Sequence, residues 1–89
     1  MAEQQETLLE FPCQFPLKIM GKHEEQFVLE VLTIVVRHAP DFDHSTMDKR
    51  PSRNGNYLSI TCTINAVSKE QLDALYREIS SHPLVKFAL

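Results

Sequence analysis

The clearest pattern in the chain is a strict alternation of apolar and polar side chains that follows the Asn54-Gly55 pair. Apolar side chains hold the even positions from Leu58 to Ala66, whereas the odd positions carry Tyr57 and then only Ser, Thr and Asn. A period of two is typical of a strand with one covered and one open face. Asn-Gly supplies the positive φ of a hairpin turn. We therefore expect a turn over residues 51–56 and a strand from Asn56 to Ala66.

Two weaker alternations predict two more strands. The odd positions from Phe15 to Ile19 are apolar, and Gly21 is expected to end this first strand. Residues 45–50 alternate less clearly and predict a second strand. The Lys, Arg and Pro at positions 49–51 would discourage another chain from pairing with it, so we place this strand at an edge of the sheet.

Two segments have the period of a helix. Between Glu24 and Pro40, apolar side chains are so frequent that the helix must be covered over much of its surface. Arg37 and His38 near its end favour the negative pole of the helix dipole. The second helix begins with a capping box, Ser68 and Gln71. It continues with apolar residues at helical spacing, Leu72, Leu75, Tyr76 and Ile79, and ends at His82-Pro83.

The last segment, in which Val85, Phe87 and Leu89 alternate with Lys86, predicts a short final strand. The order strand, helix, strand, strand, helix, strand is that of two interleaved right-handed crossovers. We therefore expect an α+β, ferredoxin-like βαββαβ split β-α-β sandwich. Its four-stranded antiparallel sheet would have the first and third strands at the centre and both helices on one face.

Composition sets limits on this domain. With 89 residues, 43% of them apolar and 24% charged, the chain is long enough for one modest core and is not a disordered chain. We expect a flexible tail over residues 1–8 and a single domain over 9–89. The acidic start resembles no secretory signal, and the apolar run from Phe27 to Val36 is too short to span a bilayer. The expected location is the cytoplasm.

The open face of the predicted sheet is polar and weakly charged, and it would carry Lys18, Ser59, Thr61, Thr63 and Lys86. RNA recognition motifs share this strand order but stack bases on aromatic rings. Here only Tyr57, at the start of its strand, offers a ring, and the formal charge is −3. We favour Ser59, Thr61 and Thr63 as an interaction surface for a protein or a small polar ligand, and RNA binding remains the weaker alternative.

A metal site is a second alternative, because His38, Asp41, Asp43 and His44 lie close together in the sequence. No C-x-x-C pair occurs, and a solvated helix end followed by a polar connection explains the same residues. Enzymatic signatures are not found: there is no nucleophile elbow and no phosphate-binding glycine loop. Cys62 shares the apolar face of its strand. We therefore expect no catalytic residue, no resident metal and no cofactor.

Gly21 lies between a central strand and the start of a helix, where a glycine leaves room for a ligand to approach backbone N–H groups. A plain turn requires a glycine at the same place. The candidate ligand site is the segment Gly21, Lys22 and His23.

The chain also resembles the YbeD-like family of small bacterial proteins. The residues that carry the resemblance run in order through Leu9-Glu10-Phe11-Pro12, Met20-Gly21, Val36-Arg37-His38-Ala39-Pro40, Asn54-Gly55-Asn56-Tyr57, Ile64-Asn65-Ala66 and Leu75-Tyr76. The family implies a ferredoxin-like fold similar to ACT domains, which sense amino acids in metabolic enzymes, and carries the label of a lipoate regulatory protein.

ACT domains commonly bind effectors near the loop after the first strand, often between two subunits. By that resemblance, Lys22 in the Gly21-Lys22-His23 loop would meet an effector carboxylate. We thus expect a non-enzymatic, cytoplasmic, dimeric regulatory or interaction module, linked to lipoate metabolism, that binds a small metabolite or a partner protein and neither nucleic acid nor a membrane.

Overall fold

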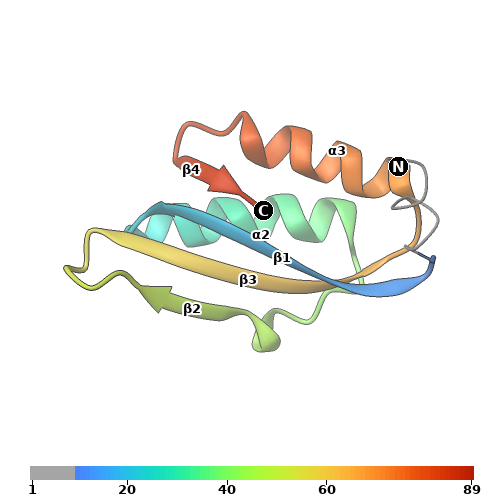
Figure 1. The fold of residues 1–89 in the computed structure, drawn as a ribbon, viewed down its shortest axis with the longest axis horizontal. Coiled ribbons are helices and arrows are strands. Elements are labelled where there is room, and N and C mark those ends of the chain that lie inside the picture. Colours follow the sequence, from blue (N-terminus) through green and yellow to red (C-terminus); the bar gives the residue numbers. More distant parts are fainter. Residues whose placement is uncertain (1–9) are drawn as a thin grey trace, which may run out of the picture.

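The computed structural model describes residues 10–89 as one four-stranded sheet covered by two helices (Figure 1). The strands are β1 (Cys13–Lys22), β2 (Asp48–Pro51), β3 (Tyr57–Ala66) and β4 (Val85–Ala88), and the helices are α2 (Glu25–His38) and α3 (Lys69–Ser80). All three strand pairs are antiparallel, in the order β2-β3-β1-β4. The ferredoxin-like α+β fold predicted from the sequence is confirmed. The predicted tail over residues 1–8 lies outside the described residues.

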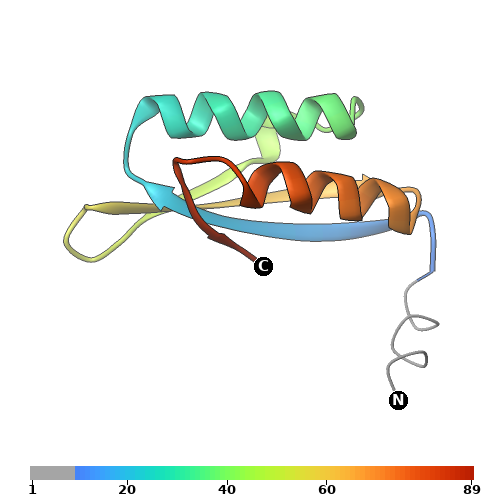
Figure 2. The same ribbon diagram turned by 90° about the horizontal axis from the view of Figure 1, so that it is seen from above.

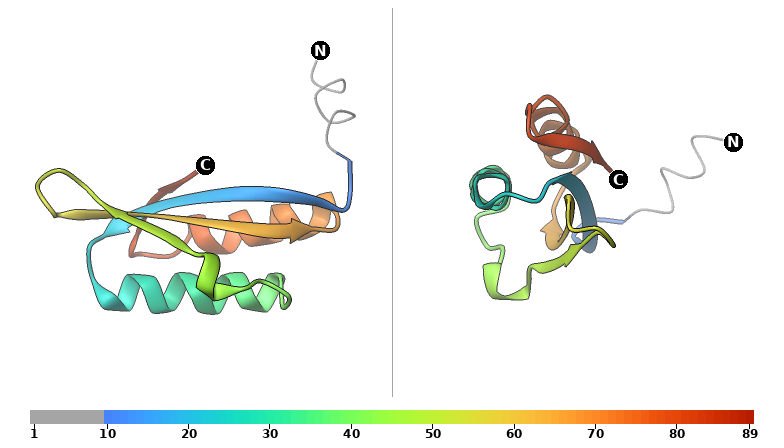
Figure 3. Two further views of the ribbon diagram at one scale, coloured as in Figure 1. Left: turned by 90° about the horizontal axis from the view of Figure 1, so that it is seen from below. Right: turned by 90° about the vertical axis from the view of Figure 1, so that its left-hand side faces the viewer.

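Both helices lie on the same face of the sheet, and the core lies between these two layers (Figures 2 and 3). The even-numbered side chains of β3 point into this core, and each is 0–5% exposed. Leu17 and Ile19 of β1 pair with Cys62 and Ile60 and are also fully buried. Burying an aliphatic side chain of this size stabilises the fold by about 1.5–3 kcal/mol. The alternation read from the sequence is therefore the alternation that builds the core.

Several strand boundaries differ by a few residues from the sequence-based expectation, most of all at the end of β1 and the start of β2. β1 does not end at Gly21 but continues to Lys22, which pairs with Tyr57. The strand expected over residues 45–50 is shorter and later, because its first residues form a 3-10 turn, His44–Thr46. The carboxylate of Asp43 accepts hydrogen bonds from the backbone N–H (3.0 Å) and the hydroxyl (2.7 Å) of Ser45. This local capping competes with the extended conformation.

The final strand is confirmed, but its side chains do not alternate as expected. Met20 pairs with Phe87 and Gly21 pairs with Val85, so β4 has one extra residue, Lys86, at a bulge. Val85 and Ala88 both pack against the core. Phe87, opposite Met20, lies on the open face of the sheet. The expectation that Val85 and Phe87 share one face is therefore wrong.

The two helices are joined at one end by Gln71. Its backbone N–H donates to the Ser68 hydroxyl at 3.0 Å, as a capping box requires. Its side-chain oxygen accepts from the N–H of Val67 at 2.7 Å, and its side-chain nitrogen donates to the carbonyl of His38 at 2.9 Å. One side chain thus satisfies backbone groups at the start of α3 and at the end of α2.

Candidate functional site

The predicted Gly21-Lys22-His23 site lies at the corner between β1 and α2. A Cβ on Gly21 would approach the Leu84 carbonyl oxygen to 2.4 Å and the Phe27 ring to 2.5 Å. Close packing against the protein itself therefore accounts for this glycine. Lys22 and His23 are exposed and line an open depression of about 270 Å³ with Glu24, Asn56 and Tyr57. Ligand binding at this corner stays a prediction.

Three of the four residues of the metal alternative have hydrogen-bond partners of their own. His38 Nε2 lies 2.7 Å from Glu78 Oε1, Asp41 accepts a 3.4 Å hydrogen bond from Asn65, and Asp43 caps the turn that contains His44. The hydrogen bonds from Ser45 hold the pKa of Asp43 below its usual value. Across residues 10–89 no three His, Cys, Asp or Glu side chains come close enough to hold a metal ion. The structure therefore gives this alternative no support.

Asp41 and Asp43 instead line a shallow depression of about 600 Å³ beside the end of β3. Its other lining residues are Gln14, Phe42, Thr46, Thr63 and Asn65. Thr63, one of the predicted surface residues, thus lies at the acidic end of the open face.

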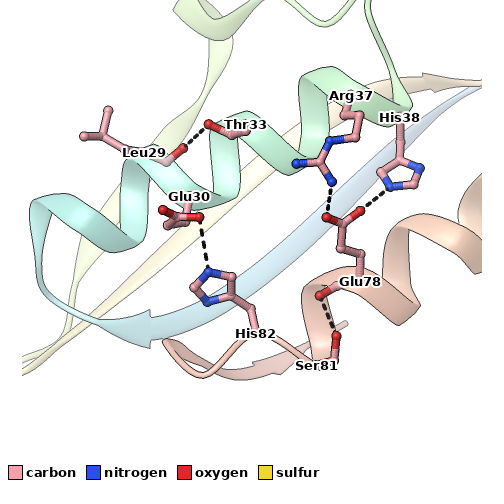
Figure 4. Close-up of polar contacts among 8 residues, drawn as sticks. All are labelled: Leu29, Glu30, Thr33, Arg37, His38, Glu78, Ser81 and His82. Atoms are coloured by element: carbon pink, nitrogen blue, oxygen red, sulfur yellow. Dashed lines mark hydrogen bonds and ion pairs between the residues drawn. The ribbon is translucent and has the colours of Figure 1, made fainter.

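Polar side chains also bridge the two helices, as Figure 4 shows. The Glu78 carboxylate of α3 contacts both the Arg37 guanidinium and the His38 ring of α2. The His38 hydrogen bond, and then that of Arg37, lowers the pKa of Glu78. Farther along, His82 Nε2 lies 3.3 Å from Glu30 Oε1. These pairs connect α2 to α3 and to the segment that follows it.

The cysteine of β3 is a core side chain. Cys62 is fully buried, and this burial raises the pKa of its thiol to about 12. Only a thiolate attacks as a nucleophile. The Cys62 thiol is buried and stays protonated at neutral pH, so its role is to pack in the core.

The open face of the sheet carries the predicted surface residues and several others. By register it presents Ser59, Thr61 and Thr63 of β3 beside the even-numbered residues of β1. Lys86 of β4 reaches over Tyr57, with its Nζ 5.4 Å from the ring centroid. Lys18 and Leu89 exchange two backbone hydrogen bonds, of 3.1 and 2.7 Å, so Leu89 extends β4 and lies on this same face. The face thus has apolar groups that the sequence reasoning did not place there.

These apolar groups surround a groove between β1 and β4, which we call the β4 groove. It has a volume of about 220 Å³ and is lined by Lys18, Ile19, Met20, Ser59, Phe87 and Leu89. Phe87 is 50% exposed and Leu89 is 68% exposed. An exposed ring beside an exposed aliphatic side chain is the composition found at the centre of protein interfaces.

Comparison with known proteins gives the family. Residues 6–89 match the family model described as "Protein of unknown function (DUF493)". The chain belongs to the DUF493 family. A UPF0250 protein of Nitrosomonas europaea is 54% identical over 85 residues, which are 96% of this chain and 98% of the relative. A UPF0250 protein of Janthinobacterium is 51% identical over 94% of this chain and 92% of the relative. The resemblance seen in the sequence is confirmed at the level of the family.

The fold also occurs in a solved structure. The C-terminal domain of the MgtC protein from Mycobacterium tuberculosis superposes with a TM-score of 0.68, covering 91% of this chain and 88% of that domain, at 15% sequence identity. At this identity the likeness concerns the fold alone. Neither helix within residues 10–89 is long and apolar enough to cross a bilayer.

Proposed function

We propose that this DUF493 protein is a non-enzymatic interaction module whose working surface is the open face of its sheet. The observation that carries the proposal is the β4 groove, where Phe87 and Leu89 leave apolar surface in water beside Met20. Nothing in the packing of residues 10–89 requires this exposure, since Val85 and Ala88 already supply the core contacts of β4. An interaction would recover the cost of exposing these side chains.

Wild type and two variants test this role in the binding of partners from an extract of the native cell. Wild-type protein, Phe87→Ser and Leu29→Ser are immobilised in equal amounts, and the retained proteins are compared quantitatively. Leu29 lies on the outer side of α2 and is 52% exposed, so it is a matched apolar control. We expect a partner that wild type and Leu29→Ser retain equally and that Phe87→Ser loses about tenfold or more. Identical retention by all three proteins would rule out the open face as the interaction surface.

A second proposal concerns a small effector at the corner of β1 and α2. The depression beside Lys22 and His23 supports it, since a lysine on the rim of a depression can meet a carboxylate. A regulatory role linked to lipoate metabolism would use this corner. In ¹H–¹⁵N NMR titrations with amino acids and lipoyl compounds, the amides of Gly21, Lys22 and His23 should shift. If all three amides stay silent at millimolar ligand, the corner is not an effector site.

We also propose that the protein forms a homodimer in the cytoplasm. β4 lies at an edge of the sheet and has one neighbouring strand, so it can pair with the β4 edge of a second subunit without bringing the two open faces together. Light scattering at tens of micromolar should give twice the monomer mass. A monomer mass at that concentration would end this proposal.

A further inference from the structure

The open face is also electrostatically different from the rest of the chain. By strand register and by the Lys86–Tyr57 contact, it carries four basic side chains, Lys18, Lys22, Arg50 and Lys86, but one acidic side chain, Asp48. Asp48 is paired with Arg50 at 3.1 Å. The chain as a whole has a formal charge of −3. The part of the face around β1 and β4 is therefore positive, whereas Asp41 and Asp43 make its other end, beside Thr63, acidic.

The positive charge is concentrated around the β4 groove. Lys18 lines the groove itself, opposite Leu89. Lys86 follows Val85 on the strand that provides Phe87, and Lys22 lies on β1 two residues beyond Met20. None of these three lysines has an ion pair with a carboxylate within residues 10–89. Positive charge beside an apolar groove attracts a ligand that combines acidic and apolar groups.

We propose that the β4 groove binds an acidic segment of another protein, with an apolar side chain seated against Phe87 and Leu89 and carboxylates facing Lys18 and Lys86. This inference rests on the proposed function and names the chemistry of its partner. A second copy of the chain placed face to face would bring the same lysines together, which like charges oppose. The positive face therefore selects a partner of opposite charge.

A nucleic acid would satisfy the lysines but fits the groove less well. Two of the groove side chains, Met20 and Leu89, are aliphatic and offer no face for stacking on a base. Of the two rings on this face, Tyr57 is covered on one side by the Lys86 ammonium group, which leaves Phe87 as the single exposed ring of the groove. Single-stranded nucleic acids are bound by open aromatic platforms. The mixture of aliphatic groups and lysines favours a protein segment.

The test is a selection from a random dodecapeptide display library against the full chain. We expect the selected peptides to be enriched in Asp and Glu beside Leu, Ile or Phe. Binding of a selected peptide should weaken about tenfold or more in the double variant Lys18→Glu/Lys86→Glu and fall as salt is raised. Lys18→Gln/Lys86→Gln gives the milder form of the same change. Arg53→Glu/Lys69→Glu, which alters the net charge equally at other exposed positions, should leave binding unchanged.

The outcomes separate this inference from the proposed function. If selected peptides require Phe87 but show no excess of acidic residues, the acidic-segment inference is wrong and the interaction role stands. If no selected peptide depends on Phe87, both are wrong. Single-stranded RNA of random sequence is titrated in parallel. Tighter binding of RNA than of the peptides, lost in the lysine double variant, would overturn the inference in favour of nucleic acid.

Discussion

The two glycines of the chain are required for unrelated physical reasons. Gly21 has no room for a Cβ, because the Leu84 carbonyl and the Phe27 ring lie against its Cα. Gly55 has open space around it but a φ of +80°, which is the left-handed region. Position 21 therefore has no space for a side chain, whereas position 55 needs a backbone conformation that residues with a side chain rarely adopt.

Alanine should destabilise the protein at both glycines, and asparagine should separate the causes. We expect Gly21→Ala to cost roughly 1–3 kcal/mol through overpacking against a carbonyl that cannot move freely. Gly55→Ala should cost roughly 1–2 kcal/mol through its positive φ. Asparagine tolerates that region, so Gly55→Asn should recover most of the loss while Gly21→Asn should be worse than alanine. Urea unfolding of the four variants gives the free energies. Recovery at position 21 would contradict the steric account.

Glu78 is the residue whose charge matters most to the helix pair. Hydrogen bonds from His38 and then Arg37 hold its pKa below the usual value of 4.5. A carboxyl whose pKa is lowered by folding stabilises the folded state above its unfolded pKa. The contribution disappears as pH falls through the lowered pKa of the folded state.

We therefore expect Glu78→Gln to reduce the free energy of unfolding at pH 6 and to matter progressively less below pH 4.5. The measurement is urea unfolding of wild type and variant across this range. Asp73→Asn is the control on the same helix, since Asp73 is paired with Lys69 on the surface. A difference between wild type and Glu78→Gln that grows as the solution becomes more acidic would contradict the assignment.

Among the elements, β3 could be predicted to within one residue from its sequence, whereas the faces of β4 could not be predicted. In β3 the side chains alternate regularly from Tyr57 to Ala66, so period and face are both visible in the residue order. In β4 the bulge at Lys86 shifts the faces, and four residues carry no local signal for an extra one. The late start of β2 had a local signal, because Asp43 two residues before Ser45 is a typical capping arrangement.

The side chain of Gln71 links α2 to α3 through hydrogen bonds to Val67 and His38, and neither bond is part of a capping box. We expect Gln71→Ala to cost roughly 1–2 kcal/mol, because the Val67 N–H and the His38 carbonyl both lose a partner. A capping box alone would accept Glu as readily as Gln. Gln71→Glu keeps the acceptor for Val67 but has no donor for His38, so it should recover only part of the loss. Thermal unfolding decides the matter. Full recovery by Glu would mean that the bond to His38 is unimportant.

At the scale of the whole molecule, the order of strands and helices in the sequence predicted the two layers of the fold. It did not predict the polar pairs that connect the two helices. His38 and Glu78 are 40 residues apart, and Glu30 and His82 are 52 residues apart. Only the packing of α2 beside α3 brings them together, so a local pattern cannot reveal them. At the corner of β1 and α2, the sequence alone was enough to single out Gly21. The two groups that leave no room for a Cβ there, the Phe27 ring of α2 and the Leu84 carbonyl before β4, could not be identified from the sequence.

Cys62 provides a probe of global unfolding, since it lies on a central strand in the middle of the core. In a Cys13→Ala background it is the remaining thiol. Its reaction with a disulfide reagent at neutral pH should be slower than that of the urea-unfolded chain by roughly a thousandfold or more. The logarithm of the rate should rise in the destabilised variants in proportion to their loss of free energy. A rate close to that of the unfolded chain would show that the sheet opens locally.

Lys86, the extra residue at the β4 bulge, does not contribute to the core of the sheet. Val85 and Ala88 would both face the core, and Phe87 the open face, in a regular strand from which Lys86 had been removed. The frame of the sheet therefore does not depend on which side chain stands at this position, or on whether one stands there at all. A substitution at this position can therefore change the charge beside the β4 groove without any change in the core.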